Sequence, residues 1–357
     1  MARTQACPEM ALILLCRLDM TAGERLTSRQ SSEFRNMAER CLRLAVKGKN
    51  RYARAVSLLL MGAVAQKEKA WGKAIRLFGL SLKADPGIEH AFWVTVRMGL
   101  CRQAQGQMDK AMEYFSQGHK AGNKAGDEIK KAWTLCNIGI CEVGKGDLDS
   151  SRHHLQAAAD AFGRIKAPLG MMAAYEELGL ICLLKGDLAG AEAITGRALD
   201  ISEDLGLALS RIKNALALKG IISIASGHHG RARSILIRAR ENGPPFFMES
   251  LGMIFLACLQ NDPASARFHL GTAADTLPLV HKPHLNLLHV LARAWILVLD
   301  GQALRAKKTL DLISHHPLTP LGLFRVWDLP GQLLSQLKSR MNPAENHHPP
   351  TNRNPSH

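Results

Sequence analysis

The chain has few aromatic residues and little sequence typical of β-strands. Phe, Trp and Tyr together make up 5% of its 357 residues, and runs rich in Val, Ile, Thr and Tyr are scarce. Strands favour these residue types, so their scarcity argues against a β-sheet protein. Leu, Ala, Lys, Arg and Glu are plentiful instead, and the sequence therefore predicts an all-α fold.

The motifs of the common catalytic classes are also missing. The segment 118–126 is rich in Gly and Lys, yet none of its lysines precedes the Ser or Thr that a nucleotide-binding P-loop requires. It falls where a link between two helix pairs belongs, and we predict a linker there. No GxSxG elbow and no cysteine with a catalytic signature occurs. We therefore expect no enzymatic activity and no cofactor.

Histidines are numerous, but their spacing does not favour a metal site. Neighbouring residues on a helix point about 100° apart, so an adjacent pair cannot readily grip one metal ion from one face. His281, His284 and His289 are better spaced, although no Cys or carboxylate lies close to them in sequence. We expect no functional metal site. The adjacent pairs are His153–His154, His228–His229, His315–His316 and His347–His348.

The eight cysteines contain no CxxC pair, and several fall on apolar helix stripes, where Cys acts as a small hydrophobic residue. This pattern favours a reducing compartment, and we expect a cytoplasmic protein. The apolar run Met10–Cys16 is short and has no small-residue cleavage site after it, which argues against a signal peptide. No apolar run reaches the ~20 residues that a membrane span needs.

The formal net charge is +15, which favours anionic partners. Basic residues are nevertheless spread along the chain, and stacking aromatics do not accompany them, so nucleic acid is not the favoured partner. One dense group could still form an anion-binding patch. It consists of Arg231, Arg233, Arg238 and Arg240.

A repeating pattern organises most of the chain. Each unit has a glycine within an apolar helix-period stretch, a break seven residues later, and a small residue twelve residues later that begins a second helical stretch. Successive first glycines are 37, 40, 40 and 41 residues apart. Two weaker units follow, with Asn261 and Gly301 at the break. The first glycines are Gly62, Gly99, Gly139, Gly179 and Gly220, and the small residues are Ala74, Ala111, Ser151, Ala191 and Ala232.

This spacing predicts pairs of antiparallel helices. We expect the first glycine to face the small residue of the second helix, so that the two helices approach closely. The break glycine should supply a left-handed cap, and the Asp after it should cap the next helix. Thr195 stands where other units have a large residue, so we expect a thin contact between that unit and the next.

Gly62, Ala74, Phe78 and Pro86 follow the pattern of the tetratricopeptide repeat, and the units as a whole resemble that family, whose usual period is about 34 residues. The longer period here resembles the variant of signalling adaptors and of MalT/LuxR-type sensor superhelices. The resemblance implies an α-solenoid of about seven antiparallel helix pairs in a right-handed superhelix. We expect it to span 53–317, with N-terminal helices at 1–52 forming a degenerate repeat or cap, a C-terminal capping helix at 318–340 and a disordered tail at 341–357.

The resemblance also implies a function. In this family the first helices line a concave groove that binds a peptide or helix of a partner protein, so we expect a non-enzymatic scaffold or adaptor. A sensor module of a signalling or transcription-regulatory system is an alternative, and a basic adaptor for RNA or anionic surfaces is a second. Matching positions give the groove residues Trp93, Arg97, Leu100, Trp133, Asn137, Ile140, Glu176, Glu177 and Asn214.

Overall fold

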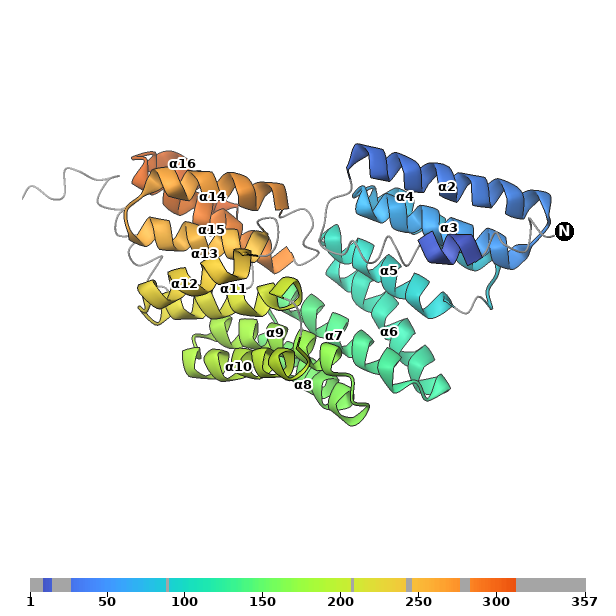
Figure 1. The fold of residues 1–357 in the computed structure, drawn as a ribbon, viewed down its shortest axis with the longest axis horizontal. Coiled ribbons are helices and arrows are strands. Elements are labelled where there is room, and N and C mark those ends of the chain that lie inside the picture. The colour runs from blue at the N-terminus through green and yellow to red at the C-terminus, as the bar shows by residue number, and fades with distance from the viewer. Residues whose placement is uncertain are drawn as a thin grey trace, which may run out of the picture. The chain divides into compact units, whose positions relative to one another are not determined.

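The computed structural model describes residues 9–14, 27–87, 90–206, 209–241, 246–276 and 283–312, and every regular element in these ranges is an α-helix (Figure 1). The chain divides into two compact units. The first comprises Met1–Ala174 with Thr276–His284, and the second comprises Tyr175–Asp275 with Leu285–His357. The boundary falls within one helix, α9. The all-α fold predicted from the composition is confirmed.

In the first unit, consecutive helices pack against each other along the chain. Turns of a few residues join them, so each helix runs back along the previous one. The unit begins with a short helix at 9–14 and contains α2 (Ser28–Lys47), α3 (Arg51–Lys67), α4 (Trp71–Ala84), α5 (Ala91–Ala104), α6 (Met108–Ala125), α7 (Glu128–Lys145), α8 (Leu148–Arg164) and the start of α9 (Pro168–Lys185).

The second unit continues the same arrangement. It holds the remainder of α9 together with α10 (Leu188–Asp204), α11 (Leu209–Ala225), α12 (His229–Arg240), α13 (Phe247–Leu259), α14 (Pro263–Thr276), α15 (Pro283–Leu299) and α16 (Ala303–Asp311). The predicted helix pairs therefore run from α3 with α4 to α15 with α16. The capping helix and tail predicted at 318–340 and 341–357 lie outside the described residues.

The N-terminal helix α2 falls within the region 1–52 where we expected a degenerate repeat or cap. Thr27 caps it, in a capping box with Gln30. Its buried side, which includes Ala38 and Cys41, joins the core of α3 and α4. The helix thereby covers apolar surface at the start of the first pair.

The first glycine of each pair corrects our expectation about helix contact. A Cβ placed on Gly62 would lie 2.5 Å from two ring carbons of Phe78, and one on Gly99 would lie 2.5 Å from the Phe115 ring. The glycine thus faces the side chain sixteen positions later, and the small residue twelve positions later comes near it only through its backbone carbonyl, as Ser151 does at 3.3 Å from the Cβ position of Gly139. The same pairing joins Gly139 to Leu155, Gly179 to Thr195 and Gly220 to Leu236.

The small residues at the twelfth position are fully buried, from Ala74 in the first pair to Ala232 in the last of the five. They bring backbone close to backbone: the Ser151 hydroxyl donates a hydrogen bond to the Gly139 carbonyl at 2.7 Å. The close approach of the two helices is therefore as expected. The side chain that fills the space above the glycine is a different one.

The helix breaks adopt the expected left-handed conformation. Gly106, Gly146, Gly186, Gly227 and Gly301 have φ between 73° and 84°. Asn261 takes the same conformation with φ 57°, and Lys69 does so in the first pair with φ 60°. A residue with a Cβ is less favourable there than glycine, by roughly 1–2 kcal/mol.

The Asp after the break caps the following helix, as predicted. Asp147 accepts a hydrogen bond from the Ser150 amide at 3.1 Å, and Asp187 accepts one from the Gly190 amide at 2.8 Å. Where Gln107 or His228 occupies this position, no side-chain cap is formed. The first turns of α6 and α12 therefore lack one stabilising contact.

Thr195 marks the position at which we expected a thin contact with the next pair. It is fully buried, and Cδ2 of Leu218 on the next first helix, α11, comes within 3.2 Å of the Cβ position of Gly179. The side chain of the following pair therefore occupies the space that a larger residue at 195 would fill. Helix α11 therefore contacts the preceding pair in two ways: through Leu218, which lies near Gly179 on α9, and through its packing on α10.

Candidate protein-interaction face

The candidate groove residues of the first unit lie on one stripe along each of two first helices, α5 and α7. Trp93, Arg97 and Leu100 are spaced i, i+4 and i+7 on α5, and such residues share one helix face. Trp133, Asn137 and Ile140 have the same spacing on α7. Because α5 and α7 are in contact, the two stripes belong to neighbouring helices.

On α5 the stripe passes from an exposed aromatic to partly buried residues. Trp93 is 39% exposed, and its ring meets that of Phe92 edge-on with centroids 4.8 Å apart. One guanidinium nitrogen of Arg97 donates to Oε1 of Gln66 on α3 at 3.1 Å, which fixes the position of this cation. Leu100 is partly buried against the core of α5 and α6.

On α7 the stripe is less exposed. Trp133 is partly buried and meets the ring of Phe162 on α8 edge-on, with centroids 5.2 Å apart. The Asn137 amide donates to the Trp133 carbonyl at 2.8 Å within the helix. Trp133 therefore supports the α7–α8 pair as well as bordering the surface, whereas Trp93 is the more accessible of the two tryptophans.

The structure adds two residues that our reasoning from the sequence missed. Ile129 on α7 is 49% exposed and lies one turn before Trp133, and Leu169 on α9 is 46% exposed in the matching position. Both stand ten residues before the first glycine of their unit. Extending the carried-over positions by one helical turn toward the N-terminus would have found them.

The remaining candidates lie in the second unit. Glu176 is partly buried and Glu177 is only 4% exposed, so Glu177 presents little surface to a partner. Asn214 on α11 is exposed.

Two of the four arginines in the candidate anion patch have carboxylate partners. Arg231 pairs with Glu192 on α10 at 3.1 Å, and Arg240 lies 3.9 Å from the buried Glu249 on α13. Burial raises the pKa of the Glu249 carboxyl, although the nearby Arg240 works in the opposite direction. Arg233 and Arg238 are exposed on α12. The patch thus offers fewer unneutralised cations than its sequence suggests.

The Gly- and Lys-rich segment 118–126 is not the linker that we predicted. It forms the last two turns of α6, and Gly126 ends the helix with φ 67°. A Cβ on Gly118 would lie 3.1 Å from Cγ2 of Thr134, and one on Gly122 would lie 3.2 Å from Cγ of Lys131. The glycines therefore allow the first turns of α7 to pack closely on α6.

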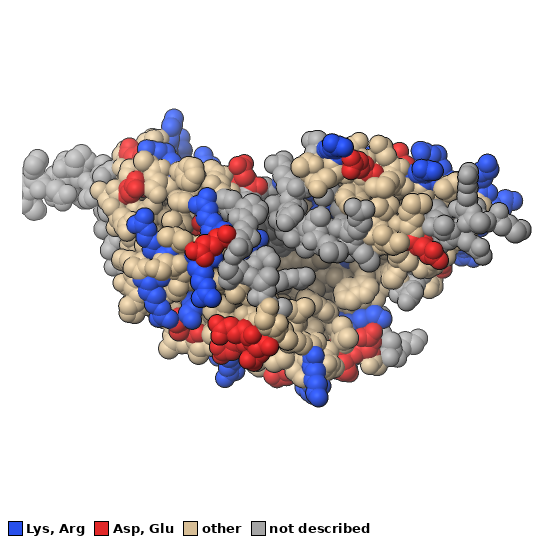
Figure 2. All heavy atoms as spheres, viewed as in Figure 1, with Lys and Arg blue, Asp and Glu red and all other residues tan. Residues whose placement is uncertain are grey.

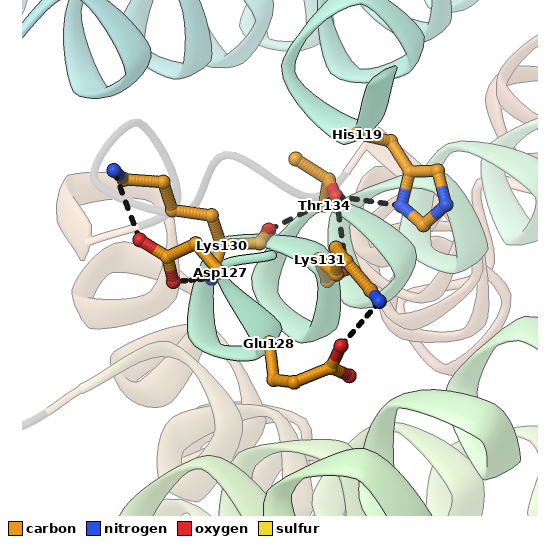
Figure 3. A network of polar contacts seen from close by, with 6 residues as sticks. All are labelled: His119, Asp127, Glu128, Lys130, Lys131 and Thr134. Carbon is orange, nitrogen blue, oxygen red and sulfur yellow. Dashed lines mark hydrogen bonds and ion pairs between the residues drawn. The ribbon is translucent and has the colours of Figure 1, made fainter. Parts of the chain in front are cut away.

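Polar contacts hold this junction together, as Figure 3 shows. Asp127 caps α7 by accepting from the Lys130 amide at 3.0 Å, and it also pairs with the Lys130 ammonium at 2.9 Å. Nδ1 of His119 lies 3.1 Å from the Thr134 hydroxyl. Hydrogen bonds with Lys130 hold the pKa of Asp127 below its usual range. The segment has a structural role in joining two pairs.

The six described cysteines are buried, and burial raises the pKa of Cys101, Cys141 and Cys258 to about 12. Such thiols stay protonated and unreactive at neutral pH. In the described ranges, no three or more His, Cys, Asp or Glu side chains gather in a way that could hold a metal ion. No helix among the described residues has the length and apolar character to cross a membrane.

The fold and these stripes define an α-helical repeat protein. Residues 90–163, which contain α5 to α8, match the tetratricopeptide repeat family model. The pairs α5–α6 and α7–α8 are therefore similar to tetratricopeptide repeats. No curated protein matches the chain in sequence.

Solved structures share the fold. A Rap protein complexed with competence and sporulation factor has a TM-score of 0.55 and 12% identity, over 94% of this chain and 100% of that one. RapI in its apo form has a TM-score of 0.53 and 10% identity, over 94% and 99%. BtubC from P. vanneervenii has a TM-score of 0.50 and 20% identity, over 60% and 91%. At these identities the likeness concerns the fold.

Proposed function

We propose that this chain is a non-enzymatic scaffold that binds a peptide segment or a helix of a partner protein along the stripes of α5 and α7. The repeat architecture supports a role in protein interaction, since stacked helix pairs present extended binding surfaces. The finer assignment rests on one observation. Large apolar side chains remain exposed at the N-terminal ends of three successive first helices, at Trp93, Ile129 and Leu169.

The chemistry of the stripes fits a protein partner. Binding hot spots are enriched in Trp and Arg and become desolvated at the centre of an interface. Trp93 would provide the aromatic anchor, and Arg97, held by Gln66, would present a fixed donor group. Leu100 and Ile140 are partly buried, lie two turns after Trp93 and Trp133 on the same stripes, and would add apolar contact there.

Paired alanine variants test this assignment. Partners should be isolated with the wild-type chain, and the affinity of each purified partner then measured for the Trp93→Ala/Ile129→Ala variant. Trp133 is a poor choice because its substitution would also remove the contact with Phe162. Loss of a hot-spot pair should weaken binding by about 30-fold or more, which corresponds to about 2 kcal/mol.

The matched control is Leu80→Ala/Ile237→Ala, because these residues are 47% and 46% exposed but lie on the second helices α4 and α12. The proposal requires that the control bind as tightly as the wild type. Equal affinities for the two double variants, with helicity unchanged by circular dichroism, would exclude the stripes as the binding surface.

A further inference from the structure

Basic residues occur along the whole chain, but the net positive charge per residue is highest in residues 27–87. Residues 27–87, which form α2 to α4, hold 13 Lys and Arg against 4 Asp and Glu, a net charge of +9. Residues 90–206 hold 13 Lys and Arg against 15 Asp and Glu, a net charge of −2. Residues 207–357 carry the same net charge as residues 27–87, with 17 Lys and Arg against 8 Asp and Glu, but over 151 residues, so the positive charge is densest on α2 to α4 and the turns between them.

The geometry of these helices gathers part of that charge at one end. Because α2, α3 and α4 alternate in direction, the end of α2, the start of α3 and the end of α4 meet. Nε of Arg51 donates to the Ala84 carbonyl at 3.3 Å, which confirms that α3 begins beside the end of α4. We call the exposed cations at this end the basic end; they are Arg43, Lys47, Lys49, Arg51, Arg54 and Lys83.

Neutralisation by carboxylates differs between the two ends of α2. Toward its start, Arg29 pairs with Glu33 and Arg35 pairs with Glu68. At the basic end, only Arg43 has an ion pair in the described residues, with Glu39 at 3.9 Å. Lys and Arg side chains are visible around the end of α2 in Figure 2.

Local stability does not explain all of these cations. Lys47 and Lys83 lie in the last turns of their helices, where positive charge is favourable. Arg54, however, lies in the first turn of α3, where the helix dipole disfavours a cation. Lys49 has φ 49°, a conformation in which glycine would be more stable.

We propose that the basic end binds the phosphate backbone of double-stranded nucleic acid. Duplex DNA carries one charge per about 1.7 Å of its axis, roughly twice the density of an extended acidic peptide with one charge per residue. Cations without carboxylate partners gain most from such a ligand, because binding releases its condensed counterions. The stripes of α5 and α7 take no part in this contact.

The neighbouring side chains favour a duplex over other polyanions. Tyr52, beside Arg51 at the start of α3, is only partly exposed because it packs against the core, so it does not present an open ring for stacking on unpaired bases. A membrane-docking surface normally adds inserted Trp, Phe or Leu to its basic residues. Val46 and Leu80 are the only large apolar side chains exposed on α2 and α4, so this surface lacks the exposed aromatic residues that would insert into a membrane.

Binding of a labelled 20-base-pair duplex to the full chain tests the proposal. Affinity is measured by fluorescence anisotropy at several salt concentrations between 50 and 200 mM. The variant Lys47→Gln/Lys49→Gln/Arg54→Gln/Lys83→Gln should bind at least about tenfold more weakly at 50 mM salt. The slope of log affinity against log salt should also become shallower by about 3 to 4, since each phosphate contact contributes about 0.9.

The matched control is Lys110→Gln/Arg152→Gln/Arg164→Gln/Arg197→Gln, which removes the same charge from exposed cations outside the basic end. Circular dichroism of both variants establishes that the helices are intact. The control should retain the wild-type affinity and slope. Equal losses in the two variants, or no duplex binding by the wild type at 50 mM salt, would overturn the proposal.

Phosphatidylserine vesicles and poly-glutamate serve as competitors in the same assay. We expect neither to displace the duplex at matched charge concentration. Displacement by vesicles that depends on the basic end would assign this surface to lipid, and displacement by poly-glutamate would assign it to acidic protein. Either result would overturn the assignment to nucleic acid.

Discussion

Adding a methyl group at Gly62 should destabilise the protein, although Gly→Ala within a helix normally stabilises it. The new Cβ would lie 2.5 Å from Cδ1 and Cε1 of Phe78, so the ring would have to retreat by about 1 Å to reach ordinary contact. Phe78 is fully buried, so its ring can retreat only by displacing other core side chains. Overpacking of this kind costs about 1–3 kcal/mol, against about 1 kcal/mol gained from helix propensity.

Gly79 provides the control in the same helix pair. No atom lies within 4 Å of its Cβ position, so Gly79→Ala should stabilise the protein by about 1 kcal/mol. The two variants should therefore differ in free energy of unfolding by about 1–3 kcal/mol. Urea denaturation followed by circular dichroism measures this difference, provided that both variants have the wild-type m-value.

A double-mutant cycle identifies the partner of the glycine. Phe78→Leu removes the ring atoms that the new methyl would meet, so Gly62→Ala should cost less in that background. Ala74→Gly should give no such relief, because the side chain of Ala74 is not what Gly62 faces. Equal stabilisation by Gly62→Ala and Gly79→Ala, or relief by Ala74→Gly alone, would refute the reasoning.

Three further changes test the caps and the buried histidines. Gln107→Asp should give α6 the side-chain cap that it lacks and raise stability by about 1 kcal/mol; thermal melts compared with Gln105→Asp, two residues earlier in the turn, check this. Lys69→Gly should raise stability by up to about 1 kcal/mol because φ is 60° there, whereas Lys67→Gly within α3 should lower it. Burial lowers the pKa of His269 and His289. Both are therefore neutral in the fold at neutral pH, and their contribution to stability is lost as pH falls below about 6.5. The melting temperature should drop between pH 7.5 and 5.5, and less so in His289→Leu; an unchanged drop would show that His289 is not responsible.

The repeat pattern allowed the helix pairs to be predicted because its signals are local. A break glycine needs its left-handed φ wherever it stands, and Asp147 caps a helix with an amide only three residues away. The identity of the residue facing each glycine depends on how two helices are rotated about their axes. Spacing within one helix does not specify that rotation, and we therefore placed Ala74 where Phe78 lies.

The candidate site was predictable to a similar extent. Register along α5 and α7 put Trp93 and Trp133 on equivalent stripes. Their burial differs, since Trp133 packs on Phe162 of the second helix α8, whereas Trp93 meets Phe92 of its own helix. The segment 118–126 was assigned to a linker on its composition. Its glycines instead serve the close packing of α6 on α7, a contact between helices that composition does not reveal.

The central proposal is that a partner protein lies along the stripes of α5 and α7. Site-specific photocrosslinking tests it most directly, with a benzophenone side chain placed at Ile129 and, in a separate protein, at the equally exposed Ile237 on α12. We predict a crosslink to a partner protein from position 129 that disappears in the Trp93→Ala background, and none to that partner from position 237. Crosslinking of the same partner from position 237 but not from 129 would contradict the proposal.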